Sequence, residues 1–419
     1  MPATATADLP SSLSHDALDP DAIEVCRRLQ DNGFPTFLVG GCVRDVLLGR
    51  SPKDYDVGTM ATPSQVRRAF RHSRLIGRRF RLVHVIIGLK TIEVATFRGA
   101  GDEEDAENSA DSQSDSDGFI VRANAFGSPE EDAHSRDFTI NALFYDPVER
   151  RLIDHVGGYP DILAGLLRTI GDPVARFRED PVRILRAVKF SSRLGFEIDP
   201  ATRAAMTEVA PDLAKCPVPR VTEEIYRIAE SGYVRPAISL MAETRLLRTV
   251  LPDIADAVAA HGTGFFRHLE LLDLHSRAHG GLPRELVLTL LLLPLVEPRL
   301  KGLDPTQAAR AIEDWLTPIG VRMHIAVRHR LFFRSLVVLV RRLTNTARPA
   351  RLSIHDRRML PVALTMLRFL HRRDGLPREI YTQWRAVAAE SGIPWVPTLS
   401  TPEDDPSERP SFDGRRARS

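Results

Sequence analysis

Apolar and polar residues follow two different periods along the chain, and the change of period divides it. Between residues 21 and 160, helix-like stretches alternate with short apolar runs of strand length, at 37–39, 54–57, 84–87, 91–97, 142–146 and 152–155. From about 161 to 390 the apolar residues recur only at helical spacing. The pattern predicts an α+β fold, with a mixed α/β head followed by a long all-α neck and body.

Three segments contain too few apolar residues to form a core. Residues 1–20 and 393–419 are rich in small and polar residues, and residues 100–118 are almost entirely Asp, Glu and Ser. Such compositions favour disorder. We therefore expect two disordered tails and an acidic disordered loop, with the head at 21–160, a helical neck at 161–235 and a helical body at 236–392.

Charge is unevenly distributed, although the net charge is only +2. Acidic residues gather at 102–117, whereas arginines recur through the C-terminal half. An excess of positive charge on one part of a chain indicates an anionic partner, although any single arginine more often faces solvent.

The cysteines and the apolar runs indicate the cellular compartment of the protein. The three cysteines are far apart and lack metal-ligand spacing, which favours a reducing compartment. The longest apolar run, 286–296, is too short to cross a bilayer, and residues 1–20 lack the pattern of a signal peptide. We therefore expect a cytoplasmic protein without membrane contact.

The run LVGGCVRDVLLGRSPKDYDV carries the strongest chemical signal. Asp54 and Asp56 are two apart on a predicted strand, so both carboxylates should point the same way. Converging carboxylates are hard oxygen ligands that suit Mg²⁺. Upstream, Gly40 and Gly41 let the backbone approach phosphates at a helix start, and Arg44 can pair with a triphosphate.

A third carboxylate would complete such a metal site, and two candidates stay open. Glu93 lies on a predicted strand with Ile92 and Val94 facing the other way. Asp137 follows Arg136 in HSRDFTINAL, where the two could instead form a structural ion pair. The residues alone do not choose between Glu93 and Asp137.

A second charged group occurs in REDPVRILRAVKF. Asp180 precedes a proline as a helix N-cap does, and Asp180, Arg183 and Arg186 share one helical face. A carboxylate beside a guanidinium can pair with the amine and ring nitrogen of adenine or cytosine, whereas guanine and uracil present the opposite pattern. Lys189 can hold a phosphate as a point charge.

The GG…RD…G…DxD pattern resembles the nucleotidyltransferase superfamily that includes DNA polymerase beta. It is most similar to the class II branch of tRNA CCA-adding enzymes and bacterial poly(A) polymerases. REDPVR resembles this family's EDxxR motif, and Arg220 and Glu224 in RVTEEIYR resemble its neck motif. The resemblance covers about residues 37–233.

The resemblance implies a role for each matching residue. It implies that Asp54 and Asp56 bind the catalytic Mg²⁺ and that Asp137 belongs to the active site. It places Arg136 at the nucleotide, and it implies that Asp180 and the arginine after it select nucleotides without a template. The neck then selects the nucleotide, and the helical body binds RNA.

The segment LIGRRFRLVHV, residues 75–85, favours one branch of the family. It resembles bacterial poly(A) polymerases, whereas CCA-adding relatives usually carry a shorter turn there. The resemblance implies template-independent polyadenylation of RNA 3′ ends, of mRNA or other transcripts, with ATP as substrate, Mg²⁺ as cofactor and pyrophosphate as product. Addition of CCA or A to tRNA is the alternative, because Asp180 with Arg183 admits both A and C. The sequence identifies no protein partner.

Overall fold

The computed structural model describes residues 18–76, 82–99, 113–114, 120–121, 127–345 and 351–393. Within these ranges the residues up to Arg183 and Gly195–Met206 form one compact unit, and Ile184–Leu194 with the residues from Thr207 form a second. Most of the predicted tails and acidic loop lies outside the described residues, as do the arginines of the 75–85 segment. Leu18 is buried, however, and β6 (Gln113–Ser114), inside the predicted loop, pairs with β7 (Ile120–Val121) just after it.

Unit 1 is built on a seven-stranded sheet in the order β3-β4-β5-β2-β1-β8-β9. Strands β2 and β5 pair in parallel, and the other neighbours are antiparallel. The strands are β1 (Thr36–Val39), β2 (Asp56–Thr59), β3 (Ser73–Ile76), β4 (Leu82–Ile87), β5 (Lys90–Thr96), β8 (Leu143–Asp146) and β9 (Arg151–Asp154).

Short helices accompany this sheet. Proline or a polar cap begins several of them: Asp19 caps α1, and Thr62 forms a capping box at the start of α3. The helical elements of this part of the chain are α1 (Pro20–Asp31), α2 (Gly41–Leu47), α3 (Pro63–Ala69), α4 (Pro129–Ser135), η2 (Thr139–Asn141), α5 (Gly158–Ala164), α6 (Pro173–Glu179) and α8 (Pro200–Val209).

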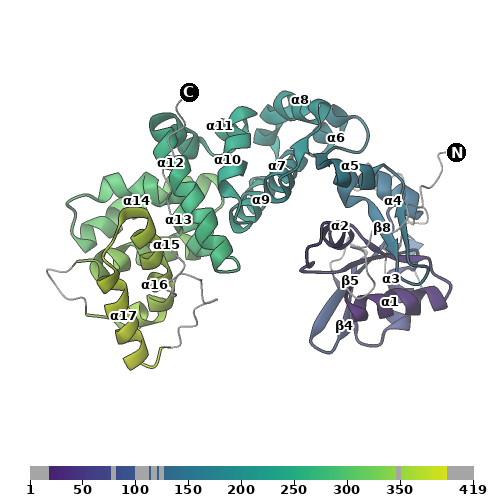
Figure 1. The fold of residues 1–419 in the computed structure, drawn as a ribbon, viewed down its shortest axis with the longest axis horizontal. Helices are drawn as coiled ribbons and strands as arrows, with labels where there is room; N and C mark the ends of the chain where they lie inside the picture. Colours follow the sequence, from purple (N-terminus) through teal and green to yellow (C-terminus); the bar gives the residue numbers. More distant parts are fainter. Residues whose placement is uncertain are drawn as a thin grey trace, which may run out of the picture. The chain divides into compact units, whose positions relative to one another are not determined.

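One face of the β3–β5 half of the sheet is covered and the other is open. Helix α3 packs against β3, β4 and β5, and Figure 1 shows α3 near the labelled strand β5. On β5, Ile92 and Val94 are buried, whereas Glu93 between them is exposed. This alternation follows from the two-residue repeat of a strand, so the polar positions of β3–β5 gather on the open face. Near the middle of the sheet, Phe37, Phe97 and Phe144 form an aromatic core with ring centroids 6.0–6.3 Å apart.

Unit 2 is helical. Helix α13 is apolar around its whole circumference because α9, α12, α15 and α16 all pack on it. No helix among the described residues is both long and apolar enough to span a membrane. The helices are α7 (Val182–Leu194), α9 (Val218–Glu230), α10 (Val234–Glu243), α11 (Leu246–Val250), α12 (Pro252–Ala278), α13 (Arg284–Val296), α14 (Pro305–Arg322), α15 (Val327–Leu343), α16 (Ile354–Asp374) and α17 (Arg378–Glu390), with 3₁₀ turns η3 (Ala210–Lys215) and η4 (Glu297–Leu300).

The structure confirms the α+β plan and corrects the prediction that residues 161–390 are purely helical. Strand β10 (Leu166–Leu167) pairs in parallel with β11 (Glu197–Ile198) inside unit 1. Strands of two residues are too short to show an alternating pattern, so periodicity missed them. The predicted head boundary at residue 160 accordingly falls inside unit 1.

Candidate active site

The turn between β1 and α2 is shaped by a close approach of Arg136. Gly40 has a φ of 72°, and a Cβ at this position would lie 2.9 Å from Nη1 of Arg136. Only glycine meets both conditions without strain. Gly41 follows as the first residue of α2. Gly40 therefore brings the backbone against the Arg136 guanidinium, and the predicted phosphate contact of the glycine pair stays a prediction.

The DYD motif straddles the start of a strand. Strand β2 begins at Asp56, and the exposed Asp54 lies in the bend before it, so the prediction of a strand over 54–57 is corrected. The reason is visible in the register: Asp56 pairs with Val39, the last residue of β1, after which Gly40 turns into α2. Residues before Asp56 therefore have no partner on β1.

Asp56 and Glu93 are direct neighbours across the sheet. They are register partners on the parallel strands β2 and β5, which places both side chains on the same face. Glu93 is also the register partner of His84 on β4, and its Oε1 lies 3.3 Å from Nε2 of that histidine. The geometry thus brings Glu93 to the DYD motif.

Electrostatics tie this group together. Burial raises the pKa of Asp56 above its usual value, the charge of Glu93 raises it further, Arg136 opposes the shift, and Asp54 adds to it. Asp56, Glu93 and Asp54 therefore repel one another as anions, and Arg136 partly compensates. A cation bound among them would remove that repulsion.

Asp137, the other candidate, accepts hydrogen bonds within a local turn. It is buried, and its Oδ1 accepts hydrogen bonds from the backbone N–H of Phe138 at 2.9 Å and from Nδ2 of Asn141 at 3.1 Å. The possible ion pair between Arg136 and Asp137 does not form, because Arg136 bonds Asp132 at 2.8 and 2.9 Å.

Asn141 joins three functional candidates. Its Oδ1 accepts from Arg44, its backbone carbonyl accepts from Arg136 at 3.1 Å, and its amide donates to Asp137. Arg44 is buried and also bonds Asp45 at 2.7 and 2.9 Å. Arg44 therefore braces the β1–α2 turn, and its predicted contact with a triphosphate stays a prediction. This linking role of Asn141 had no signal in the sequence.

The carboxylates fit Mg²⁺ in chemical kind. Among the residues with a described placement, no three His, Cys, Asp or Glu side chains converge closely enough to enclose a metal ion. Asp54 and Glu93 are exposed, however, and the raised pKa of Asp56 marks a crowded anionic site. Oxygen ligands gathered in this way are those that Mg²⁺ accepts, together with water and phosphate oxygens.

The EDxxR segment lies between α6 and α7 in unit 1. Oδ1 of Asp180 accepts from the backbone N–H of Val182 at 3.2 Å, as its predicted capping role requires. Arg183 is buried, and its Nη1 donates to Glu179 at 2.8 Å and to the carbonyl of Arg176 at 3.0 Å.

Arg176 connects this segment to the Arg136 region, a link that the sequence did not reveal. Its Nη2 donates to the backbone carbonyls of Ser135 at 2.8 Å and Arg136 at 2.9 Å. Its Nη1 bonds Glu179 at 2.7 Å. Because Glu179 also bonds Arg183, one chain of hydrogen bonds runs from the base-selecting candidate to Arg136.

Two further candidates belong to unit 2. Nζ of Lys189 lies 2.8 Å from Oε2 of Glu224; Glu224 is buried and Lys189 is partly buried. Burial lowers the pKa of Lys189, and the charge of Glu224 opposes the shift. Glu224 also pairs with Arg227 at 2.9 Å. Arg186 lies over the ring of Phe190, 5.7 Å from its centroid.

Comparisons with known proteins follow this division of the chain. Residues 36–168 match the family described as the poly A polymerase head domain. Residues 195–258 match the family described as the probable RNA and SrmB-binding site of polymerase A.

Individual relatives carry two activities in their names. The chain is 44% identical over 251 residues to poly(A) polymerase I of Escherichia coli O6:H1, covering 60% of this chain and 54% of the relative. It is 38% identical over 235 residues to the CCA-adding enzyme of Geobacillus thermodenitrificans, covering 56% and 55%. The chain thus spans about half the length of these curated relatives.

Solved structures agree with the fold. The Bacillus stearothermophilus CCA-adding enzyme in complex with CTP matches with a TM-score of 0.62 at 27% identity, covering 89% of this chain and 83% of that one. A tRNA nucleotidyltransferase complexed with a primer tRNA and an ATP analogue matches with a TM-score of 0.55 at 22% identity, covering 88% and 98%.

Proposed function

We propose that the chain is a class II nucleotidyltransferase, which transfers AMP from ATP to RNA 3′ ends without a template and releases pyrophosphate. The observation that carries the proposal is the 44% identity to poly(A) polymerase I over 251 residues, against 38% to a CCA-adding enzyme over a similar stretch. The carboxylates of Asp54 and Asp56 at the start of β2, with Glu93 beside them, supply the matching chemistry.

We assign the metal-binding role to Asp54, Asp56 and Glu93. Mg²⁺ held there would activate the attacking hydroxyl and stabilise the leaving pyrophosphate. Glu93 is preferred to Asp137 because it is the register partner of Asp56, whereas Asp137 bonds Phe138 and Asn141. Asp137 then acts as a positioning residue, which holds Asn141 against the arginine-lined turn.

The chain's own residues orient the substrates. Arg136, whose charge acts on Asp56, is the candidate for contact with the nucleotide phosphates. Asp180 and Arg183 are the candidates for reading adenine, with the carboxylate accepting from its amine and the guanidinium donating to a ring nitrogen. Glu179 and the Arg176 carbonyl accept hydrogen bonds from Nη1 of Arg183, so the guanidinium is already oriented in the absence of a base.

Addition of CCA or A to tRNA is the second candidate. Solved structures that match most of this chain include a CCA-adding enzyme bound to CTP. A carboxylate–guanidinium pair also accepts cytosine, since both bases present an amine beside a ring acceptor.

One experiment separates the two functions. Purified protein is incubated with a generic single-stranded RNA and with tRNA that lacks its 3′ end, each nucleotide being supplied separately and then together. Long tails made from ATP alone on either RNA support polyadenylation. Growth that stops after a defined C and A addition to tRNA supports the second candidate, and no incorporation on any RNA refutes both.

A further inference from the structure

A row of ionisable side chains crosses the sheet from the candidate active site to its edge. Asp56 on β2 pairs with Glu93 on β5, Glu93 with His84 on β4, and His84 with Arg74 on β3. Register partners point to the same face, so all four side chains lie on the open face of the sheet. Three strand spacings of roughly 4.8 Å put the Arg74 Cα roughly 14 Å from that of Asp56.

The edge end of this row is strongly basic. Between the end of α3 and the middle of β3, four arginines and one histidine occur without an acidic residue, and all five are exposed. We call this group the β3 edge surface; it consists of Arg67, Arg68, Arg71, His72 and Arg74.

The arginines of the β3 edge surface are not neutralised. Among the residues that the structure describes, the side chains of these four arginines have no ion pair and no hydrogen bond. In the same unit, Arg136, Arg176 and Arg183 are each paired with a carboxylate. Unpaired guanidinium groups beside one another raise the local potential and favour a polyanionic partner.

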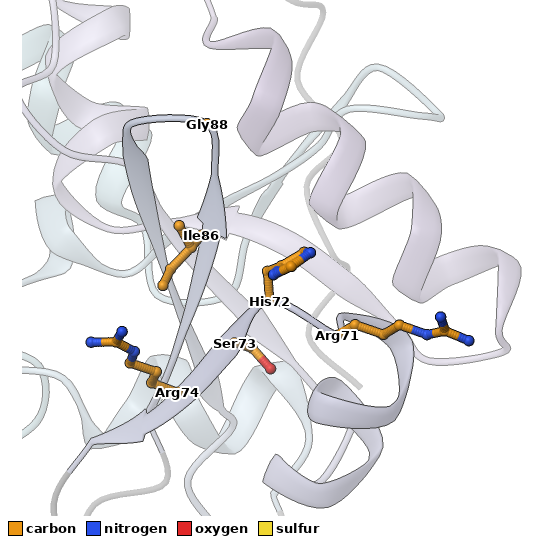
Figure 2. A pocket seen from close by; sticks show the side chains of 6 residues that line it. All are labelled: Arg71, His72, Ser73, Arg74, Ile86 and Gly88. Atoms are coloured by element: carbon orange, nitrogen blue, oxygen red, sulfur yellow. The ribbon is translucent and has the colours of Figure 1, made fainter.

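The surface also contains a hollow of about 370 Å³. Figure 2 shows Arg71 and Arg74 extending to opposite sides, with His72, Ser73 and Ile86 between them. Ile86 offers an apolar side chain between the charges. A nucleotide presents the complementary features, since its base has an apolar face and its phosphate is anionic.

We propose that the β3 edge surface binds the phosphate backbone of the RNA substrate, a few nucleotides upstream of the 3′ end that reacts near Asp56. The inference rests on the proposed function, because it takes the RNA 3′ end to lie at the carboxylate group. A stacked strand advances roughly 3.4 Å per nucleotide, so roughly 14 Å corresponds to about four nucleotides. The row from Asp56 to Arg74 then marks the path of the RNA across the head.

The opposite edge of the sheet offers a matched control. Strand β9 is the opposite edge of the same sheet and carries the exposed residues Arg150 and Arg151 at its start. The test compares two double variants. The β3 variant combines Arg71→Gln and Arg74→Gln, and the β9 variant combines Arg150→Gln and Arg151→Gln. Both remove two exposed positive charges from a sheet edge.

The measurement is the affinity for oligoadenylate between about 0.05 and 0.2 M salt, with the full chain. Each lost phosphate contact should lower the slope of log affinity against log salt by about 0.7, so the β3 variant should lose about 1.4. If the β3 variant and the wild type bind equally at 1 M salt, this loss of slope corresponds to about 25-fold weaker binding of the variant at 0.1 M salt. In the β3 variant, the affinity for primers shorter than about four nucleotides and the KM for ATP should not change. The β9 variant should have the same salt slope as the wild type.

Three results would overturn the inference. An unchanged salt slope would show that the β3 arginines contact no phosphate. A raised KM for ATP with unchanged RNA affinity would assign them to the nucleotide. Aggregation of the β3 variant with full RNA affinity would assign them to edge protection, a common role of charge on edge strands. If instead the slope falls as expected but the wild type extends no RNA, the proposed function fails and the binding surface stands.

Discussion

The buried pair of Lys189 and Glu224 allows a sharp test of what Lys189 does. The sequence indicates that this lysine can hold a phosphate, and the structure pairs it with Glu224 at 2.8 Å, with side-chain exposures of 13% and 7%. Replacing Glu224 by leucine leaves a buried ammonium without its partner. Removal of one member of a buried pair costs about 3–5 kcal/mol.

The structure places the expected loss at the lower end of that range. Burial already lowers the pKa of Lys189, so the orphaned lysine can lose its proton and avoid part of the penalty. About 3 kcal/mol corresponds to a decrease in Tm of about 6–12 °C for a helical unit of this size. Replacing both residues, Lys189→Met with Glu224→Leu, should restore most of the stability, because an apolar pair of similar volume removes the desolvation penalty.

The assay combines thermal unfolding with steady-state kinetics. We expect Glu224→Leu to unfold at lower temperature, and the double variant to unfold near the wild type and keep a KM for ATP within about threefold, less than the energy of one hydrogen bond. A stable double variant whose KM for ATP rises about tenfold or more would refute this reasoning and indicate that Lys189 binds the nucleotide.

Two other substitutions test the hydrogen-bond networks of the head. Asn141→Ala removes a partner of both Arg44 and Asp137. It should cost about 1.5–3 kcal/mol in urea unfolding, because the Arg44 guanidinium is buried, and an unchanged midpoint would contradict the linking role. Asp180→Ala should admit GTP or UTP by removing the acceptor for the adenine amine; competition assays that still show strict ATP use would exclude Asp180 from base selection.

The sequence predicted the parts of the fold that carry a strong periodic signal. The strand at 91–97 was visible because Ile92 and Val94 alternate with polar residues, and the structure has β5 at Lys90–Thr96. Strands β10 and β11 were missed because two residues show no period. The start of β2 was misplaced because it depends on where its partner β1 ends, which is a property of the pairing.

The candidate site was predictable in its residue types and less so in its contacts. The sequence left Glu93 and Asp137 both open, and the register of β2 with β5 makes Glu93 the neighbour of Asp56. Asp132, the partner of Arg136, gave no signal that separated it from other acidic residues of α4. A side chain's partner depends on tertiary packing, which spacing along the chain does not encode.

Asp56 offers the most direct test of the central claim, because its carboxylate should matter for reaction and not for folding. Its pKa is raised in the fold, so the protonated form stabilises the protein below the unfolded-state value of 3.8, and this contribution is lost as pH rises through the folded-state pKa. At neutral pH the charged carboxylate is therefore unfavourable for folding, and Asp56→Asn should be at least as stable as the wild type.

The measurement is the initial rate of AMP incorporation from ATP into RNA by Asp56→Asn, with thermal unfolding and RNA affinity recorded on the same protein. We predict a rate at least about a hundredfold lower, since several kcal/mol of transition-state stabilisation would be lost, together with unchanged RNA affinity. A stable Asp56→Asn protein that still incorporates AMP at the wild-type rate would contradict the account.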